Sequence, residues 1–420
     1  MRIVNAIALD PATESRIENA VIDIGNGRII WVGEEADAPA APAGGEVVDA
    51  RGRVVLPGLI DCHVHFASFA DDPGQTQLGV TESTIAASTL RGAWSARRML
   101  SSGVTSARDC GCKHLGIFAL RDAIQTGMLR GPRILAAGAG ITRTGGTGYR
   151  TSAEEVDGAE GVREAVRRRI RDGADVIKFF TSGGTLHPSA ASGGVQYSEE
   201  EIRIGLTEAS VIGRRTAVHA EARGAIALAV KHGATSIDHG TELDSEIACE
   251  MASRGTFLVP TLWHYQKVVV AGRDYGFDDE IVEIARDRRD AGTRAFQAAI
   301  SAGVRVAAGT DSGGPRYRSG SLHMELRYMG VSGMSSMEVL RSATVNAADC
   351  LGIEAGRLAP GYLADLVSFE DDPARDLAAL ARPWLVVKDG VVEVRDSEGV
   401  DRRTEPAHDW LLEVEGSPVG

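Results

Sequence analysis

The hydrophobic and polar positions of the chain follow two patterns. Near both ends, apolar and polar residues alternate with a period of two, which predicts strands with one buried face at 2–9, 20–33, 46–56, 363–369 and 384–394. Gly-Asn-Gly at 25–27 and Asp-Gly at 389–390 predict hairpin turns. We therefore expect both chain ends to meet in one small β-sandwich domain, formed by residues 1–54 and 356–395.

The middle of the chain alternates short β-branched runs with longer amphipathic segments. Helices are predicted at 160–172 and 198–213, the second beginning with a capping box between Ser198 and Glu201. Eight strands are predicted, at 54–61, 104–109, 133–139, 175–181, 215–220, 235–240, 256–261 and 304–310. Eight β-α units over about 300 residues are typical of an α/β fold of the (β/α)8 TIM-barrel type, which we assign to residues 55–355. Residues 396–420 read as an acidic tail.

Polar side chains that could bind a metal stand at the ends of five predicted barrel strands. They are His63, His65, Lys178, His219, His239 and Asp311. The functional groups of such barrels lie at the carboxyl ends of the strands, so these side chains should converge on one mouth. Four imidazoles and a carboxylate suit zinc or a similar divalent ion.

Lys178 is the unusual member of this set. It lies within Val176-Ile177-Lys178-Phe179-Phe180, and an ammonium group there would be costly to bury and unable to bind a metal. Burial favours the neutral amine, which CO2 can convert to a carbamate with two oxygens able to bridge two ions. Only five of the 45 basic residues are lysines, and an arginine at this position could not be carboxylated.

The composition excludes several classes of protein. The 420 residues are 43% hydrophobic and 25% charged, as in ordinary globular enzymes, and the net charge of −13 argues against nucleic-acid binding. Five thinly spread cysteines are no disulfide framework, and we interpret Cys110 and Cys112 as reduced thiols rather than a metal pair. No signal peptide and no membrane-spanning apolar run is recognisable, so we predict a cytoplasmic protein without membrane partners.

As an ordered set, these motifs resemble the amidohydrolase superfamily. The matching segments are 57–65 (PGLIDCHVH), 177–178 (IK), His219, 238–240 (DHG), 309–312 (GTDS) and 356–367 (GRLAPGYLADLV). The run from Val176 to Gly184 most resembles the prolidase-like and imidazolonepropionase-related group. That group contains dipeptidases and hydrolases of N-acyl amides, carbamates and phenylureas.

The resemblance implies a role for each candidate ligand. His63, His65 and Asp311 would hold the more buried of two divalent ions, His219 and His239 the more exposed one, and carboxylated Lys178 would bridge them. A hydroxide shared by the ions would attack the carbonyl of a C–N bond. Asp311 would act as general base and then as general acid for the leaving nitrogen. The substrate would be a small-molecule amide, peptide, carbamate or urea, and the protein a homo-oligomer.

The sequence departs from the group around the expected substrate pocket. Dipeptidases of the group commonly have a histidine where this chain has Glu221, and the segment 145–149 (GGTGY) replaces a histidine-containing loop. Candidate substrate contacts are Glu221, His264, Tyr149 and Arg316, with Trp263, Tyr265 and Arg318 as further possibilities. We interpret His187, His232, His323 and His408 as structural and leave His114 open.

Two alternatives use the same barrel. The first is a mononuclear ring-opening hydrolase or deaminase. The position of Glu221, two residues after His219, resembles imidazolonepropionase, whereas deaminases typically have a glutamate three residues after this histidine, and both enzyme types lack the lysine that this chain has at 178. A non-catalytic scaffold would have lost metal ligands, and none of the expected ligands is missing here.

Overall fold

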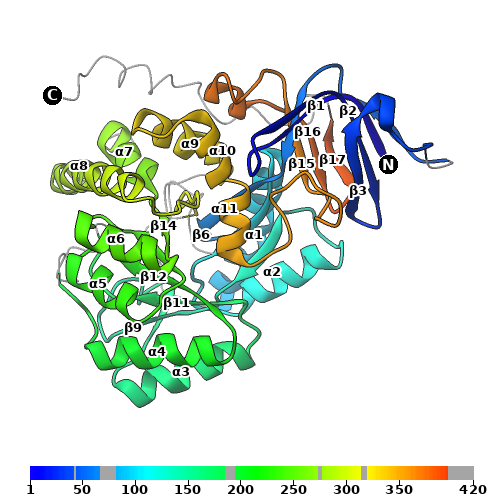
Figure 1. Cartoon of the computed structure of the whole chain (residues 1–420). Coiled ribbons are helices and arrows are strands. Elements are labelled where there is room, and N and C mark those ends of the chain that lie inside the picture. Colours follow the sequence, from blue (N-terminus) through cyan, green and yellow to red (C-terminus); the bar gives the residue numbers. More distant parts are fainter. Residues whose placement is uncertain (42–43, 67–81, 185–193, 273–276, 314–318, 396–420) are drawn as a thin grey trace.

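The computed structural model describes residues 1–41, 44–66, 82–184, 194–272, 277–313 and 319–395. In Figure 1 the first strands (blue) and the last strands (orange to red) lie side by side at one end of the molecule, and the intervening strands and helices fill the rest.

Strands from both chain ends form a single eight-stranded sheet in the order β17-β16-β15-β5-β1-β2-β3, with β4 paired to β1. It has its own core, which includes Ile22, Leu366 and Trp384. A β-sandwich has two sheets packed face to face. The predicted sandwich is not shown, because the described terminal strands form one hydrogen-bonded sheet. Its strands are β1 (Arg2–Asp10), β2 (Ser15–Gly25), β3 (Arg28–Glu34), β4 (Val47–Asp49), β5 (Val54–Pro57), β15 (Leu366–Phe369), β16 (Pro383–Lys388) and β17 (Val391–Arg395), with 3-10 turns η1 (Glu35–Asp37) and η2 (Leu377–Ala381).

Both predicted hairpin turns are present in this sheet. Asn26 and Gly27 join β2 to β3 with φ angles of 50° and 73°, and Asp389 and Gly390 join β16 to β17 with φ angles of 49° and 76°. Two consecutive left-handed residues are the requirement of a tight turn that matches strand twist, which explains the Asn-Gly and Asp-Gly choices.

The central strands form two parallel sheets. One has the order β6-β7-β8 and the other β10-β9-β11-β12-β13-β14. Their bounds are β6 (Leu59–Val64), β7 (Val104–Asp109), β8 (Arg133–Ala136), β9 (Gly140–Thr142), β10 (Ala153–Glu155), β11 (Val176–Phe180), β12 (Arg215–Ala220), β13 (Ser236–His239) and β14 (Phe257–Val259).

The predicted strand at 304–310 is an extended segment with isolated bridges rather than an assigned strand. Val306 bridges to Leu258 of β14, and Ser312 bridges to Val64 of β6, both in parallel. The Cys62 amide also donates to the Ala308 carbonyl at 2.8 Å. The segment therefore lies between the two parallel sheets, although the assigned strands do not close into one continuous ring.

The predicted strand at 54–61 divides at Gly58. β5 pairs with β1 and β15 of the terminal sheet, whereas β6 pairs with β7 in the centre. A Cβ atom at Gly58 would collide with the Thr105 side chain, so the close approach at this junction requires glycine. An apolar run read along one chain could not reveal this change of partner.

Helices cover the outer side of the central strands. In Figure 1, α3 to α6 (greens) lie outside β9, β11 and β12. The bounds are α1 (Glu82–Ser101), α2 (Gly116–Gln125), α3 (Ala159–Arg171), α4 (Glu199–Val211), α5 (Arg223–Lys231), α6 (Ser245–Arg254), α7 (Leu262–Ala271), α8 (Asp279–Ser301), α9 (Leu322–Val331), α10 (Ser336–Ser342) and α11 (Val345–Leu351). The capping box of Ser198 and Glu201 is confirmed. Within the described ranges, no helix has the length and apolarity needed to cross a membrane.

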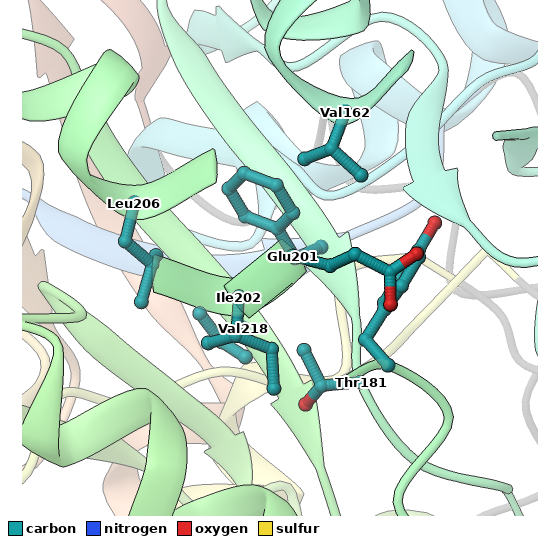
Figure 2. Close-up of a pocket in the computed structure, with 8 residues that line it drawn as sticks. Val162, Thr181, Glu201, Ile202, Leu206 and Val218 are labelled. Atoms are coloured by element: carbon teal, nitrogen blue, oxygen red, sulfur yellow. The ribbon is translucent and has the colours of Figure 1, made fainter. Parts of the chain in front are cut away.

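Alternate residues of β11 and β12 serve different faces. Phe179 and Val218 line a small, largely apolar pocket with Val162 of α3 and with Ile202 and Leu206 of α4 (Figure 2). Because successive side chains of a strand point to opposite faces, Lys178 and His219 point away from these helices and toward the inside of the molecule. This pocket is helix packing rather than the mouth of the active site.

Candidate metal centre

The fold brings the four predicted histidines together. The ring centroids of His63 and His65 are 5.3 Å apart, those of His63 and His239 5.1 Å, and those of His239 and His219 4.7 Å. They come from the carboxyl ends of β6, β12 and β13. Because the carboxyl ends of parallel strands lie at the same edge, residues distant in sequence meet there.

Asp311 completes a group that fits one ion. Its Oδ1 lies 3.4 Å from His63 Nε2 and 3.3 Å from His65 Nε2, and these three residues form a possible metal-binding group. Donors around a tetrahedral zinc ion with bonds of about 2.1 Å are separated by about 3.4 Å. The spacing of the three donor atoms therefore suits a tetrahedral ion.

Three of the four clustered histidines favour the neutral form that a metal requires, whereas at His65 burial is outweighed by the contact with Asp311, which raises the pKa. Burial, assisted by the charge of Lys178, lowers the pKa of His63 to about 4 and that of His219 to about 3. Burial also holds the pKa of His239 well below its usual value. A neutral imidazole has a lone pair available for a cation at physiological pH.

Oxygen atoms contact one nitrogen on each of three of the rings. His65 Nδ1 lies 3.0 Å from the Gly111 carbonyl, His239 Nδ1 lies 2.7 Å from the Thr261 hydroxyl, and His219 Nε2 lies 3.1 Å from the Gly183 carbonyl. Such partners fix the orientation of a metal-binding imidazole and the nitrogen that it presents.

Three non-glycine residues at the site adopt left-handed backbone conformations. The φ angles are 71° at His239, 48° at Thr261 and 52° at Asp311. This conformation costs roughly 1–2 kcal/mol in an ordinary residue. At His239 it ends the alternation of β13, so the consecutive side chains Asp238 and His239 both reach the histidine cluster.

Three imidazoles surround the Asp311 carboxylate. Burial alone would raise its pKa, but His264, His63 and His65 hold that pKa well below its usual range. His264 Nδ1, on α7, lies 3.2 Å from Asp311 Oδ2, on the opposite side of the carboxylate from the other two histidines. Sequence analysis had taken His264 as a substrate contact, and the structure places it against Asp311.

Comparison with known proteins identifies the chain. Residues 54–392 match the model of the Amidohydrolase family. The chain belongs to the amidohydrolase family. The fold of this family is a TIM barrel, and the chain is a hydrolase acting on carbon–nitrogen bonds.

Three relatives illustrate the range of the similarity. The chain is 31% identical to an ochratoxinase of Aspergillus niger, over 91% of this chain and 84% of that protein. It is 27% identical to an imidazolonepropionase of Acidiphilium cryptum, over 92% of this chain and 94% of that protein. The crystal structure of a Xaa-Pro dipeptidase with bound methionine in its active site matches with a TM-score of 0.83 and 31% identity, over 93% of this chain and 98% of that one.

The other predicted substrate contacts of this amidohydrolase differ in position. Glu221 is buried, with its Oε1 4.0 Å from His219 Nε2 and its Oε2 3.8 Å from Arg288. Tyr149 is half-buried, and its hydroxyl accepts from Arg150. Arg316, with Arg318, His187, His408 and the tail at 396–420, lies outside the described residues.

Aromatic and histidine side chains near the site also have structural partners. Trp263 and Tyr265 are buried in α7, and the Tyr265 hydroxyl lies 3.3 Å from that of Thr241. His114 bonds through both ring nitrogens, to the Ser88 hydroxyl and to the Gly116 amide, and His232 pairs with Glu199. The described cysteines, Cys110 and Cys112 included, are free thiols, as predicted.

Sequence analysis missed two buried charged residues below the histidine cluster. Asp238 contacts Lys178 Nζ and also Arg108, which lies on β7. Burial would raise the pKa of Asp238, but Lys178 and Arg108 hold it well below its usual range. Asp238 lies on the same face of β13 as Ser236, whose hydroxyl donates to it at 3.3 Å, so ordinary strand alternation carries it inward. The motif 238–240 contained Asp238, but its contacts with Lys178 and Arg108 depend on other strands and appear only in the structure.

Proposed function

We propose that the protein is a binuclear metal-dependent hydrolase that cleaves the C–N bond of a small amide. The observation that carries this proposal is the convergence of Asp311 Oδ1 on two imidazole nitrogens at a tetrahedral donor spacing. His63, His65 and Asp311 would hold one divalent ion, which we take to be zinc, and His219 and His239 would hold the second.

Lys178 would bridge the two ions as a carbamate. Its neutral amine would form an N–C bond to CO2 and release one proton to solvent, which leaves a carboxylate group bonded to the former amine nitrogen. Lys178 is 1% exposed, and its Nζ lies 5.1 Å from the centre of the Phe180 ring. An enclosed position of this kind protects a carbamate from the water that would reverse its formation.

When bound, two divalent ions lower the pKa of water and polarise a carbonyl oxygen. Asp311 accepts the proton of the attacking water and returns it to the leaving nitrogen. Its contact with His264 steadies Oδ2, so that Oδ1 keeps its orientation toward His63 and His65 during the proton transfers. Glu221, close to His219, would orient a donor group of the substrate.

Dipeptides and N-acyl amino acids are the substrate class that we favour, ahead of carbamates and ureas. The support is the similarity to the Xaa-Pro dipeptidase structure and to the ochratoxinase, each at 31% identity over more than nine-tenths of this chain. The expected products are a carboxylic acid and an amine.

Metal analysis and a hydrolysis screen test this proposal. We expect two divalent ions per chain after loading with zinc and CO2, and hydrolysis in a panel of dipeptides, N-acyl amino acids, phenylureas, carbamates and lactones. Lys178→Ala should abolish activity and second-ion binding, whereas the exposed control Lys231→Ala should change neither. Fewer than one tightly bound ion per wild-type chain, or full activity in Lys178→Ala, would contradict the binuclear mechanism.

A mononuclear ring-opening hydrolase is the second candidate. The similarity to imidazolonepropionase and the carboxylate of Glu221 beside His219 favour it. Opening of a lactam-like ring by a protein with one ion per chain, retained in Lys178→Ala, would establish this alternative and exclude the first.

The closed barrel with its separate terminal domain, the cellular location and the oligomeric state are also proposals. We propose that the two parallel sheets and the segment 304–312 together form the closed barrel of the family, within residues 55–355, and that 1–54 and 356–395 form a separate small domain. The predicted cytoplasmic location and homo-oligomeric state are tested by cell fractionation and by sedimentation of the purified protein.

A further inference from the structure

The Asp238 side chain contacts proposed ligands of both ion sites. It is fully buried on β13. Its Oδ2 contacts Lys178 Nζ, the group that would bridge the ions, and lies 3.2 Å from Nδ1 of His63, a proposed ligand of one ion. One carboxylate oxygen thus faces two proposed ligands from different strands.

The other oxygen of Asp238 is held by the protein. Oδ1 accepts from Arg108 Nη2 at 3.0 Å and from the Ser236 hydroxyl at 3.3 Å. Arg108 is itself fixed, because its Nε donates to the Cys62 carbonyl at 2.6 Å and its Nη1 to the Ser236 hydroxyl at 3.0 Å. A buried carboxylate without partners would be costly, and the Arg108 guanidinium supplies a compensating charge in a fixed geometry.

A third metal ion is a weaker interpretation of the same residues. His63, Cys110 and Asp238 have potential ligand atoms within 4.8 Å of one another. The carboxylate, however, already contacts Lys178 Nζ and pairs with the Arg108 guanidinium, and the fixed charge of Arg108 would repel a further cation. The arrangement is therefore better suited to holding side chains than to holding an ion.

We propose that Asp238, anchored by Arg108, is the positioning residue that couples the two ion sites by orienting Lys178 and His63 together. This inference rests on the proposed function. Lys178 Nζ retains a hydrogen both as an amine and as a carbamate, so the contact with Asp238 Oδ2 persists through carboxylation. The same oxygen lies 3.2 Å from Nδ1 of His63, on the side of the ring away from Nε2, which faces Asp311.

Asp238→Asn tests the inference, because the amide is nearly isosteric but has a single acceptor oxygen. If that oxygen stays with Arg108, the NH2 group faces the donors of Lys178 and His63. Asp365→Asn is a matched control, since Asp365 is a buried aspartate paired with Arg133 at 2.6 Å in the terminal sheet. Ser236→Ala is a milder variant that removes one donor to Oδ1 and keeps the carboxylate.

Zinc affinity is measured by competition with a chelating dye, together with ions per chain and the visible spectrum of the Co²⁺-loaded protein. We expect Asp238→Asn to weaken zinc binding about 10–100-fold and to alter the Co²⁺ spectrum. Ser236→Ala should weaken binding less, and Asp365→Asn should retain wild-type affinity and spectrum.

The outcomes separate this inference from the proposed function. Wild-type affinity in folded Asp238→Asn would overturn the inference. If that variant does not fold, wild-type affinity in Ser236→Ala would overturn it. Two ions in the wild type without hydrolysis of any C–N bond would refute the proposed function alone. A wild type that binds no ion would refute both.

Discussion

Glu325 offers a sharp test of how burial and hydrogen bonding compete in this molecule. The side chain is fully buried on α9, and its two oxygens accept the amides of Leu262 at 2.9 Å and Trp263 at 2.7 Å, at the start of α7. Thr261, which precedes that helix, supplies no side-chain cap of its own. Glu325→Gln keeps the shape but removes the ionisable group and one acceptor.

The sign and size of the effect follow from the pKa. Burial outweighs the two N–H bonds and raises the pKa of Glu325 from 4.5 to about 8. Below pH 4.5 the carboxyl is protonated in the folded and the unfolded chain. Between pH 4.5 and 8 the unfolded chain ionises first, so the free energy of unfolding falls by about 1.4 kcal/mol per pH unit, or up to about 5 kcal/mol in all.

In Glu325→Gln the free energy of unfolding should not show this fall between pH 4.5 and 8. We expect the variant to be about 1–2 kcal/mol less stable than the wild type at pH 5, because one acceptor is replaced by a donor. It should be more stable than the wild type at pH 8.5. At about 2.1 cal/mol/K per residue of unfolding entropy, the melting-temperature difference should change by about 5 °C across this range.

Calorimetry of both proteins from pH 5 to 9 measures that difference and cancels groups that both proteins share. Glu338→Gln is a control without pH dependence in this range, because hydrogen bonds from Ser335 lower the pKa of Glu338 from 4.5 and its contribution to stability is lost only below that pH. A melting-temperature difference for Glu325→Gln that stays constant within 1 °C would refute the reasoning. It would mean that the two amides keep the carboxylate ionised throughout.

Three further predictions concern packing and the metal centre. Gly205→Ala should lower the free energy of unfolding by about 1–3 kcal/mol despite the higher helix propensity of alanine, because its Cβ would lie 2.7 Å from the Phe179 ring; denaturant unfolding measures this. Asp311→Asn should reduce kcat about 10²–10⁴-fold with an unchanged circular dichroism spectrum, and near-wild-type kcat would exclude its role in proton transfer. Thr261→Val removes the partner of His239 Nδ1 and should weaken metal binding about 10–100-fold in dye competition, whereas unchanged affinity would show that this hydroxyl does not orient the ring.

The residues at the centre of the site were predictable because their positions depend on simple rules. Parallel strands end at one edge, so His63, His219 and His239 could be expected to meet before any coordinates were known, and the ring distances agree. The turns at Asn26-Gly27 and Asp389-Gly390 were predictable for a similar reason, since few residues tolerate left-handed backbone conformations.

The residues around that centre were not predictable, because their positions depend on local exceptions to those rules. His239 reaches the site beside Asp238 only because its backbone is left-handed, and Thr261 is also in a conformation that its residue type disfavours. Glu325 caps a helix from which it is about 60 residues distant in sequence. Arg316 and the acidic tail lie outside the described residues, and their predicted roles stay predictions.

The topology of the terminal sheet has a consequence for folding during synthesis. β5 pairs on one side with β1, which has already been made, and on the other with β15, in a register that joins Pro57 to Leu366. Translation at about 5–20 residues per second separates these partners by roughly 15–60 s. During that interval the nascent chain carries an unpaired, apolar strand edge at β5, which is a template for pairing with other chains. Slowing translation should therefore increase aggregation. Deleting the strands from β15 onward should increase it more than substitutions in the central helices that lower the free energy of unfolding by the same amount.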